Sequence, residues 1–213
     1  MIAVIIPTLN RPHKVQEIVD NLDATAPNAL PYFVIEEHDN ATAEAIKAAG
    51  AQKIINTRSP SYAGAVNTAL QQTDEPYLFV SADDFFYHTG WLEPLLENSK
   101  SYGLCASNDL HNSDVKAGRL ATCFLITREY AETACIDEPG VMLHEGYTHN
   151  FVDTEISETA ISRGQFVYCP DSIVEHKHYL WGLAPKDATY EKTLLHHSQD
   201  EALFYQRRKL WQQ

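Results

Sequence analysis

Short apolar runs alternate with amphipathic stretches over the first 84 residues. We predict a strand at each of the four apolar runs, 2–6, 32–36, 53–56 and 77–80. The stretches between these runs repeat apolar residues every three or four positions, as Val15, Ile18 and Leu22 do, which is typical of the buried face of a helix. Because strands that alternate with helices favour a parallel sheet covered on both faces, this half of the chain predicts an α/β fold.

The pattern changes after residue 84. Short apolar runs predict further strands at 104–107, 120–127, 166–169 and 172–175. A short helix is expected at 91–96, and helical spacing returns at 151–163, whereas 136–150 has no periodicity and is predicted to be a loop over the site. We therefore expect one domain over 1–185, made of the halves 1–84 and 85–185, followed by a C-terminal helical tail at 186–213.

Composition narrows the class of protein. The chain has 213 residues, a net charge of −13 and 44% apolar residues, which fits one globular domain of ordinary size. No apolar run reaches the ~20 residues that span a bilayer, and no export signal is recognisable, so we expect a cytoplasmic protein. Four cysteines without a Cys-x-x-Cys pair predict buried thiols, and the acidic balance argues against binding to a phosphate backbone.

Polar residues follow the predicted strands of the first half, where ligands bind in open parallel sheets. These residues are Pro7, Thr8, Asn10, Arg11, Glu36, Glu37, His38, Asp39, Arg58, Ser59, Asp83 and Asp84. Neither Gly-x-Gly-x-x-Gly nor a P-loop motif occurs, which disfavours a dinucleotide or P-loop site. A phosphorylated ligand held by carboxylates needs a divalent cation between the like charges, so the pattern favours a metal-dependent site.

Three segments resemble the family 2-like glycosyltransferases of the GT-A fold in order and spacing. The segments are IAVIIPTLNRP from residue 2, YAGAVNTALQQTDEPYLFVSADD from residue 62 and FVDTEISETAISRGQFVYCPDSIVEH from residue 151. The resemblance implies a Rossmann-like αβα sandwich whose central sheet is mostly parallel, with a small antiparallel C-terminal part. It also implies transfer of a sugar from a nucleoside diphosphate donor, usually with Mn²⁺ or Mg²⁺.

The family's acidic metal motif falls on residues 81–84. The usual pattern is Asp-x-Asp, and Ser81 stands in place of its first aspartate. By resemblance, Asp83 is the metal-binding carboxylate and contacts the donor, and Asp84 is a second candidate. A histidine after the last strand completes the metal site in many relatives, and this chain offers His176 and His178 on one face of an extended segment.

The family's catalytic base corresponds to Asp153, at the start of a predicted helix, and its usual acidic neighbour is replaced by Val152. In an inverting mechanism this carboxylate removes the proton of the acceptor hydroxyl. We expect the helix N-terminus to lower the pKa of Asp153 and keep it ionised. Glu155 and Glu158 are competing carboxylates, which we expect to be mainly solvated.

The resemblance places the donor nucleoside near Pro7, Thr8, Asn10 and Arg11, with Glu36 or Glu37 receiving the base or ribose. Arg58 and Asn67 match further polar positions of the family, although Asn67 equally suits a packed helix residue. Lys186 is a candidate for meeting the diphosphate oxygens. A UDP-sugar is the donor that we favour.

The acceptor side is less defined. Candidates for lining an acceptor pocket are Tyr147, His149, Asn150 and Trp181, since aromatic faces pack on sugar rings or bases. A glycan, a lipid-linked sugar, a protein or a modified DNA base remain open as acceptors, and a homo-oligomer is possible. The alternatives to a transferase of this kind are a nucleotidyltransferase and a catalytically inactive binding module.

Overall fold

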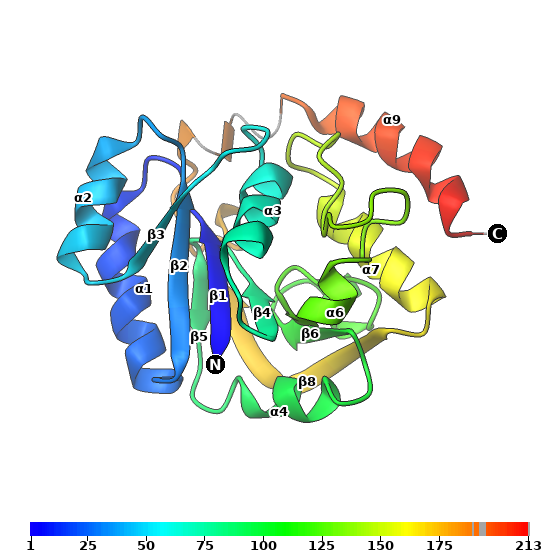
Figure 1. The fold of residues 1–213 in the computed structure, drawn as a ribbon, viewed down its shortest axis with the longest axis horizontal. Helices are drawn as coiled ribbons and strands as arrows, with labels where there is room; N and C mark the ends of the chain where they lie inside the picture. Colours follow the sequence, from blue (N-terminus) through cyan, green and yellow to red (C-terminus); the bar gives the residue numbers. More distant parts are fainter. Residues whose placement is uncertain (189, 192–194, 213) are drawn as a thin grey trace.

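A single curved sheet of eight strands organises the molecule (Figure 1). The computed structural model describes residues 1–188, 190–191 and 195–212. The strands are β1 (Ile2–Pro7), β2 (Ala29–Ile35), β3 (Gln52–Ile55), β4 (Tyr77–Val80), β5 (Phe85–Tyr87), β6 (Leu104–Asn108), β7 (Phe124–Thr127) and β8 (Phe166–His176). Their spatial order is β3-β2-β1-β4-β7-β6-β8-β5.

The sheet combines a parallel part with an antiparallel part. β3, β2, β1 and β4 pair in parallel, whereas β7 runs antiparallel to both β4 and β6. β8 is parallel to β6 and antiparallel to β5. The predicted α/β fold, with a mostly parallel sheet and an antiparallel C-terminal part, is confirmed. Because β7 reverses between them, β4 and β6 point the same way, and their carboxyl ends share an edge with β1 and β2.

Helices cover both faces of this sheet. They are α1 (Pro12–Thr25), α2 (Asn40–Ala48), α3 (Tyr62–Gln72), α4 (Glu93–Asn98), α5 (Ser113–Lys116), α6 (Arg128–Ala131), α7 (Val152–Ser162) and α9 (His197–Arg207), with 3-10 turns η1 (Tyr179–Trp181) and η2 (Arg208–Leu210). In Figure 1, α1 and α2 lie on one side of β1 and β2, and α3, α6 and α7 lie on the other. Among the described residues, no helix is both long enough and apolar enough to cross a membrane.

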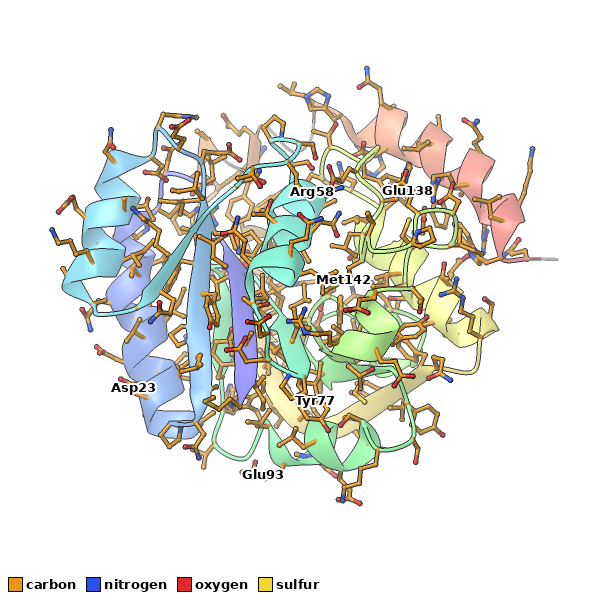
Figure 2. The ribbon with its side chains drawn as sticks, viewed as in Figure 1. Asp23, Arg58, Tyr77, Glu93, Glu138 and Met142 are labelled. Carbon is orange, nitrogen blue, oxygen red and sulfur yellow. The ribbon has the colours of Figure 1, made fainter. Side chains whose placement is uncertain are left out.

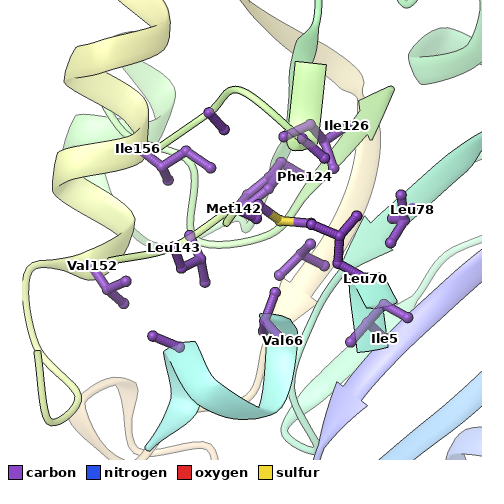
Figure 3. Close-up of a cluster of buried hydrophobic side chains, with 14 of the residues drawn as sticks. Ile5, Val66, Leu70, Leu78, Phe124, Ile126, Met142, Leu143, Val152 and Ile156 are labelled. Atoms are coloured by element: carbon purple, nitrogen blue, oxygen red, sulfur yellow. The ribbon is translucent and has the colours of Figure 1, made fainter. Parts of the chain in front are cut away.

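The pleat of β1 divides the hydrophobic core in two. Ala3 and Ile5 face the cluster that includes α3 and α7, whereas Val4 and Ile6 face the cluster that includes α1. Figure 3 shows the first cluster, in which side chains from β1, α3, β4, β7 and α7 meet around Met142. Phe204 and Trp211 of the C-terminal segment are buried in this same cluster. The division at residue 185 stays a prediction, although the two parts share a core.

Three details of the antiparallel part differ from the predicted elements. The predicted strand at 120–127 is confined to β7, which begins only at Phe124. The two strands predicted at 166–169 and 172–175 form one strand, β8, with an irregularity opposite Ser107 and Asn108. The short edge strand β5 was not predicted. The segment 136–150 contains no helix or strand, as predicted.

Candidate active site

Asp84 and two histidines converge at the carboxyl edge of the sheet. Asp84 follows β4, and His176 and His178 lie at the end of β8; one ligand atom from each lies within 4.8 Å of the other two. Nε2 of His176 lies 3.2 Å from Oδ2 of Asp84, and the Tyr190 hydroxyl donates to the same oxygen at 2.8 Å. Oδ1 of Asp84 is buried and has no hydrogen-bond partner among the described residues.

The electrostatics of this group suit a divalent cation. Burial opposes ionisation of Asp84, but the contacts with His176 and Tyr190 outweigh it and lower its pKa to about 2. Burial lowers the pKa of His178 to about 4, helped by the neighbouring His176. An ionised carboxylate and a neutral imidazole are the forms that bind metals. The orphaned Oδ1 and the two rings therefore fit a divalent metal, and the role of these three predicted residues as its ligands stays a prediction.

Asp83 makes a different contact. Its Oδ1 accepts a hydrogen bond from Nη1 of Arg11 at 2.5 Å, and both residues are buried. Burial raises the pKa of Asp83 to about 7, and the like charge of Asp84 adds to this, against the opposing effect of Arg11. The structure thus brings two predicted donor residues together, and the geometry favours Asp84 over Asp83 as the metal ligand.

Residues of the C-terminal segment cover Arg11. Asp187 accepts from Nε and Nη2 of Arg11 at 2.8 and 2.9 Å, and the guanidinium lies 4.5 Å from the centre of the Tyr190 ring. Neither Asp187 nor Tyr190 was predicted, because the sequence around them contains no motif of the family. Lys186 is exposed, 5.7 Å from the centre of the Tyr179 ring. Its contact with a diphosphate stays a prediction.

Ser81, which stands in place of the first aspartate of the Asp-x-Asp pattern, is buried and has its own hydrogen-bond partners. Its side chain is fully buried, and its hydroxyl accepts a hydrogen bond from the Tyr87 hydroxyl at 2.8 Å. The Ser81 carbonyl accepts a bond from the Tyr62 hydroxyl at 3.0 Å. A carboxylate at position 81 would be a third buried acid beside Asp83 and Asp84, which is costly without further compensation.

Asp153 lies in the first turn of α7 and is half-buried. Its Oδ1 accepts a hydrogen bond from the backbone N–H of Thr154 at 2.8 Å. Burial nevertheless raises the pKa of Asp153, which is the opposite of the shift expected from the helix N-terminus. Burial raises the pKa of Tyr62 as well, and the nearby charges of Asp153 and Asp84 contribute. Tyr62 is thus near both carboxylates, although it was not among the predicted residues.

The other predicted donor residues line the ends of β1 and β2. Pro7 is the last residue of β1, and the next residue, Thr8, is buried. The backbone N–H of Asn10 donates a hydrogen bond to the Asp39 carboxylate at 2.8 Å. Asp39, one of the polar residues expected after the second strand, also caps α2, so this carboxylate joins two loops of the edge. Glu36 accepts from the Asn56 amide at 2.9 Å, whereas Glu37 is exposed. Neither glutamate is distinguished as the donor contact.

Arg58 and Asn67 hold the loop 136–150. Arg58, labelled near α3 in Figure 2, forms an ion pair with Glu145. The Asn67 amide donates to the Leu143 carbonyl at 2.7 Å and to Glu145 at 2.9 Å, and its oxygen accepts from two backbone N–H groups of the loop. Asn67 is fully buried, so its geometry favours the packed role over contact with a donor.

The predicted acceptor residues have different environments. Tyr147 is 1% exposed and its hydroxyl donates to Glu155 at 2.6 Å, so it does not fit the expected place in an acceptor pocket. His149 lies edge-on to Tyr62 with ring centres 6.1 Å apart, near the base candidate. Trp181 is 41% exposed and stacks on His111, with ring centres 5.8 Å apart. Asn150 donates to Asp200.

The expectation that Glu155 and Glu158 are solvated was wrong. Glu155 is 5% exposed and accepts from Nε and Nη2 of Arg207 at 2.9 and 2.8 Å. Glu158 is half-buried and forms a two-point contact with Arg208 at 2.9 and 2.8 Å. Both carboxylates are held by arginines, so among the acidic residues of α7 Asp153 stays the predicted base.

Cys135, Asp137 and His144 form a second group whose ligand atoms lie within 4.8 Å of one another. Arg207 donates to both oxygens of Asp137, at 2.9 and 2.7 Å, and lies 3.9 Å from the Cys135 sulfur. Burial raises the pKa of Cys135 to about 12, which keeps the thiol protonated. A cation already occupies this group, so the metal candidate is the group at Asp84.

Comparisons with known proteins agree with this architecture. The chain resembles glucosyl-3-phosphoglycerate synthase from Mycobacterium tuberculosis, solved with Mn²⁺, UDP and glucosyl-3-phosphoglycerate, at a TM-score of 0.63 and 12% identity over 84% of this chain and 72% of that one. It also resembles a mannosyltransferase from Pyrobaculum calidifontis, solved with GDP-Man and Mn²⁺, at a TM-score of 0.65 and 15% identity over 88% of this chain and 58% of that one.

These structural likenesses establish the GT-A fold. A comparison with curated proteins finds no match. The family model for glycosyl transferase family 2 matches residues 3–153, which is more than half of the chain and includes both the acidic motif at 81–84 and Asp153. The protein therefore belongs to glycosyl transferase family 2.

Proposed function

We propose that the protein transfers a sugar from a nucleoside diphosphate donor to an acceptor hydroxyl, with inversion and with a divalent metal ion. The observation that carries this proposal is the group of Asp84, His176 and His178 at the carboxyl edge, with its orphaned carboxylate oxygen. The same edge carries Arg11 and, on a separate helix, Asp153. Both similar structures named above were solved with Mn²⁺ and a nucleotide or nucleotide sugar, which supports Mn²⁺ and leaves Mg²⁺ as the alternative.

Asp84, His176 and His178 would hold the metal, with Asp83 as a further candidate. A bound cation of this kind neutralises the charge that develops on the leaving nucleoside diphosphate. Arg11 supplies a second, permanent positive charge beside Asp83, and burial by Tyr190 strengthens its interaction with an anion. The residues of the edge thus favour departure of the diphosphate.

Asp153 serves as the general base in this proposal. The acceptor oxygen bonds to the anomeric carbon on the face opposite the diphosphate, and the bond from that carbon to the diphosphate oxygen breaks with its electron pair. The acceptor proton passes to the Asp153 carboxylate. Because burial raises the pKa of Asp153, its ionised form is a stronger base than a solvated aspartate.

The acidic surroundings bear on the choice of acceptor. Of the basic run at 207–209, Arg207 is buried against Glu155 and Arg208 is paired with Glu158. This run therefore does not offer the positive surface that a DNA acceptor requires. The exposed face of Trp181 favours an acceptor with a sugar ring, such as a glycan or a lipid-linked sugar.

The test is binding and turnover of nucleotide sugars with and without Mn²⁺. We expect calorimetry to show UDP binding that depends on Mn²⁺, and a screen of UDP- and GDP-sugars to identify the donor by release of nucleoside diphosphate. Binding of UDP without any dependence on metal would contradict the metal site. Metal-linked binding without turnover of any nucleotide sugar would indicate a binding module, and release of pyrophosphate from a nucleoside triphosphate with a sugar phosphate would indicate a nucleotidyltransferase.

Asp153→Asn tests the base. We expect transfer to fall by about 10²–10⁴-fold while the affinity for UDP and Mn²⁺ stays within about twofold, because the base acts on the acceptor. Glu158→Gln is the matched control, since it removes the same charge from the same helix without touching the site. Full transfer activity in Asp153→Asn would show that Asp153 is not the base.

A further inference from the structure

A buried carboxylate of α9 binds the segment that precedes the base candidate. Asp200 is 2% exposed and accepts hydrogen bonds from three consecutive backbone N–H groups, those of Thr148, His149 and Asn150, at 2.9, 3.0 and 2.8 Å. These hydrogen bonds outweigh the effect of burial and lower the pKa of Asp200, so the group is ionised at neutral pH. The chain is thereby fixed at three successive positions.

The next residue is held by the same helix. Phe151 precedes α7 with a left-handed backbone conformation, φ 64, which is unfavourable for a residue other than glycine. Its ring stacks on Phe204 with centres 5.3 Å apart and lies edge-on to His197 at 5.2 Å. Because α9 contacts every residue from 148 to 151, it fixes the turn by which the chain enters α7.

The body of α7 is attached to the same C-terminal segment. Arg207 binds Glu155 and Arg208 binds Glu158, one and two turns into α7. Asp153 lies between Phe151 and Glu155, two residues from each, and the C-terminal segment contacts both of these residues. In Figure 1, α9 lies beside α7 at the C-terminal end of the chain. The residues of α9 lie outside the part matched by the family model, so the family pattern does not supply this arrangement.

We propose that Asp200 is a positioning residue for the transfer reaction, which holds the 148–151 turn and thereby sets the place of Asp153. This rests on the proposed function, in which Asp153 is the base. A base must lie within hydrogen-bond reach of the acceptor hydroxyl, and a displacement of about 1 Å far from the chemistry costs about 10²-fold in rate. Asp200 lies about 50 residues after the 148–151 turn, so no local sequence pattern links the two. It nevertheless fixes three backbone N–H groups of this turn.

The test compares Asp200→Ala and Asp200→Asn with the wild-type chain. We expect kcat for release of UDP from UDP-glucose, or of GDP from GDP-mannose, to fall by about 10–100-fold. The affinity for UDP with Mn²⁺ should stay within about twofold, because the metal and donor residues lie on other elements. Hydrogen exchange at 148–155 should accelerate at least tenfold, with no change in the amides of α1.

Two controls separate positioning from loss of stability. Arg208→Gln breaks a more exposed contact of the same C-terminal segment and should leave kcat near wild type. Leu22→Ala destabilises the core on the opposite face of the sheet and should lower the melting temperature without lowering kcat at 20 °C. A purely structural role for Asp200 would make its variants behave like Leu22→Ala.

The outcomes distinguish this inference from the proposed function. If Asp153→Asn loses transfer but the Asp200 variants keep wild-type kcat, the positioning role is overturned while the base remains. If Asp153→Asn keeps full activity, the assignment of the base fails first. Should the wild-type chain turn over neither nucleotide sugar, hydrogen exchange decides: unchanged exchange at 148–155 in Asp200→Ala would refute the hold on this segment.

Discussion

Replacing Arg207 by methionine should destabilise the protein strongly. Arg207 and Glu155 have side chains that are 8% and 6% exposed, so the substitution leaves Glu155 buried without its cation. Breaking a buried ion pair by removing one partner costs about 3–5 kcal/mol. Asp137, the other partner, is 44% exposed and regains water, so it adds little to the cost. Methionine fills the volume of the aliphatic stem, which limits any cavity contribution.

Urea denaturation followed by circular dichroism measures this loss. A thermal scan gives a second measure. For a chain of this length, a loss of about 3–5 kcal/mol in the free energy of unfolding corresponds to a fall in melting temperature of about 6–20 °C. Arg208→Met is the matched control, because the Arg208 and Glu158 side chains are 36% and 23% exposed, and an exposed pair contributes about 0–1 kcal/mol. A loss for Arg207→Met within 1 kcal/mol of the control, at equal denaturant slopes, would refute the reasoning.

A double substitution tests the cause of the loss. In Arg207→Met with Glu155→Gln the uncompensated charge is gone, while the glutamine oxygen still accepts a hydrogen bond from Tyr147. We expect this variant to regain at least half of the stability lost by Arg207→Met, because the penalty comes from the buried charge. A double variant as unstable as the single one would show that the loss is due to packing.

Three further predictions concern the site and its support. His176→Ala should weaken Mn²⁺ binding by at least about tenfold in calorimetry, and an unchanged affinity would remove the residue from the metal site. Asp187→Asn should tighten UDP binding in the presence of Mn²⁺ by up to about tenfold, since Asp187 now competes for Arg11; weaker binding would mean that Asp187 helps to hold the donor. Because the pKa of Asp200 is lower in the folded than in the unfolded chain, its carboxylate stabilises the fold at pH values above the unfolded pKa of about 4. This stabilisation is lost as the pH falls through the folded pKa. Asp200→Asn should therefore make the free energy of unfolding depend less steeply on pH in the acid range.

The amino-acid sequence was enough to predict those helices and strands whose apolar pattern lies within a short stretch of the chain. The helices of the first half were predicted because each buries one face and therefore repeats apolar residues every three or four positions. The strands were predicted because they are short, continuous apolar runs. β5 has only the three residues Phe85–Tyr87, and its identity depends on pairing with β8, about 90 residues later. β8 was divided in two because Pro170 and Asp171 interrupt the apolar run, although the backbone continues through the irregularity.

The same limit applies to the site. Asp84 and His176 lie in segments that resemble the family, so their convergence could be expected before the fold was known. Glu155 reads as a solvated helix residue, and its partner Arg207 is 52 positions away. Tyr190 and Asp200 carry no local signal either, since each is defined by what it contacts across the fold. Long-range partners of this kind are set by tertiary packing, which no sequence window contains.

Two opposing effects act on the pKa of Asp153: the helix N-terminus lowers it, and burial raises it. A helix N-terminus stabilises a carboxylate by about 0.3–1 kcal/mol at an exposed site, which is less than one pKa unit. Burial of a carboxyl group raises its pKa by up to about 3–5 units. The sequence places Asp153 at a helix start but does not show that its carboxyl group is buried, so only the smaller effect could be predicted from the sequence. In the structure burial wins, and in the proposed mechanism the same burial would make the ionised form of Asp153 a stronger base toward the acceptor hydroxyl.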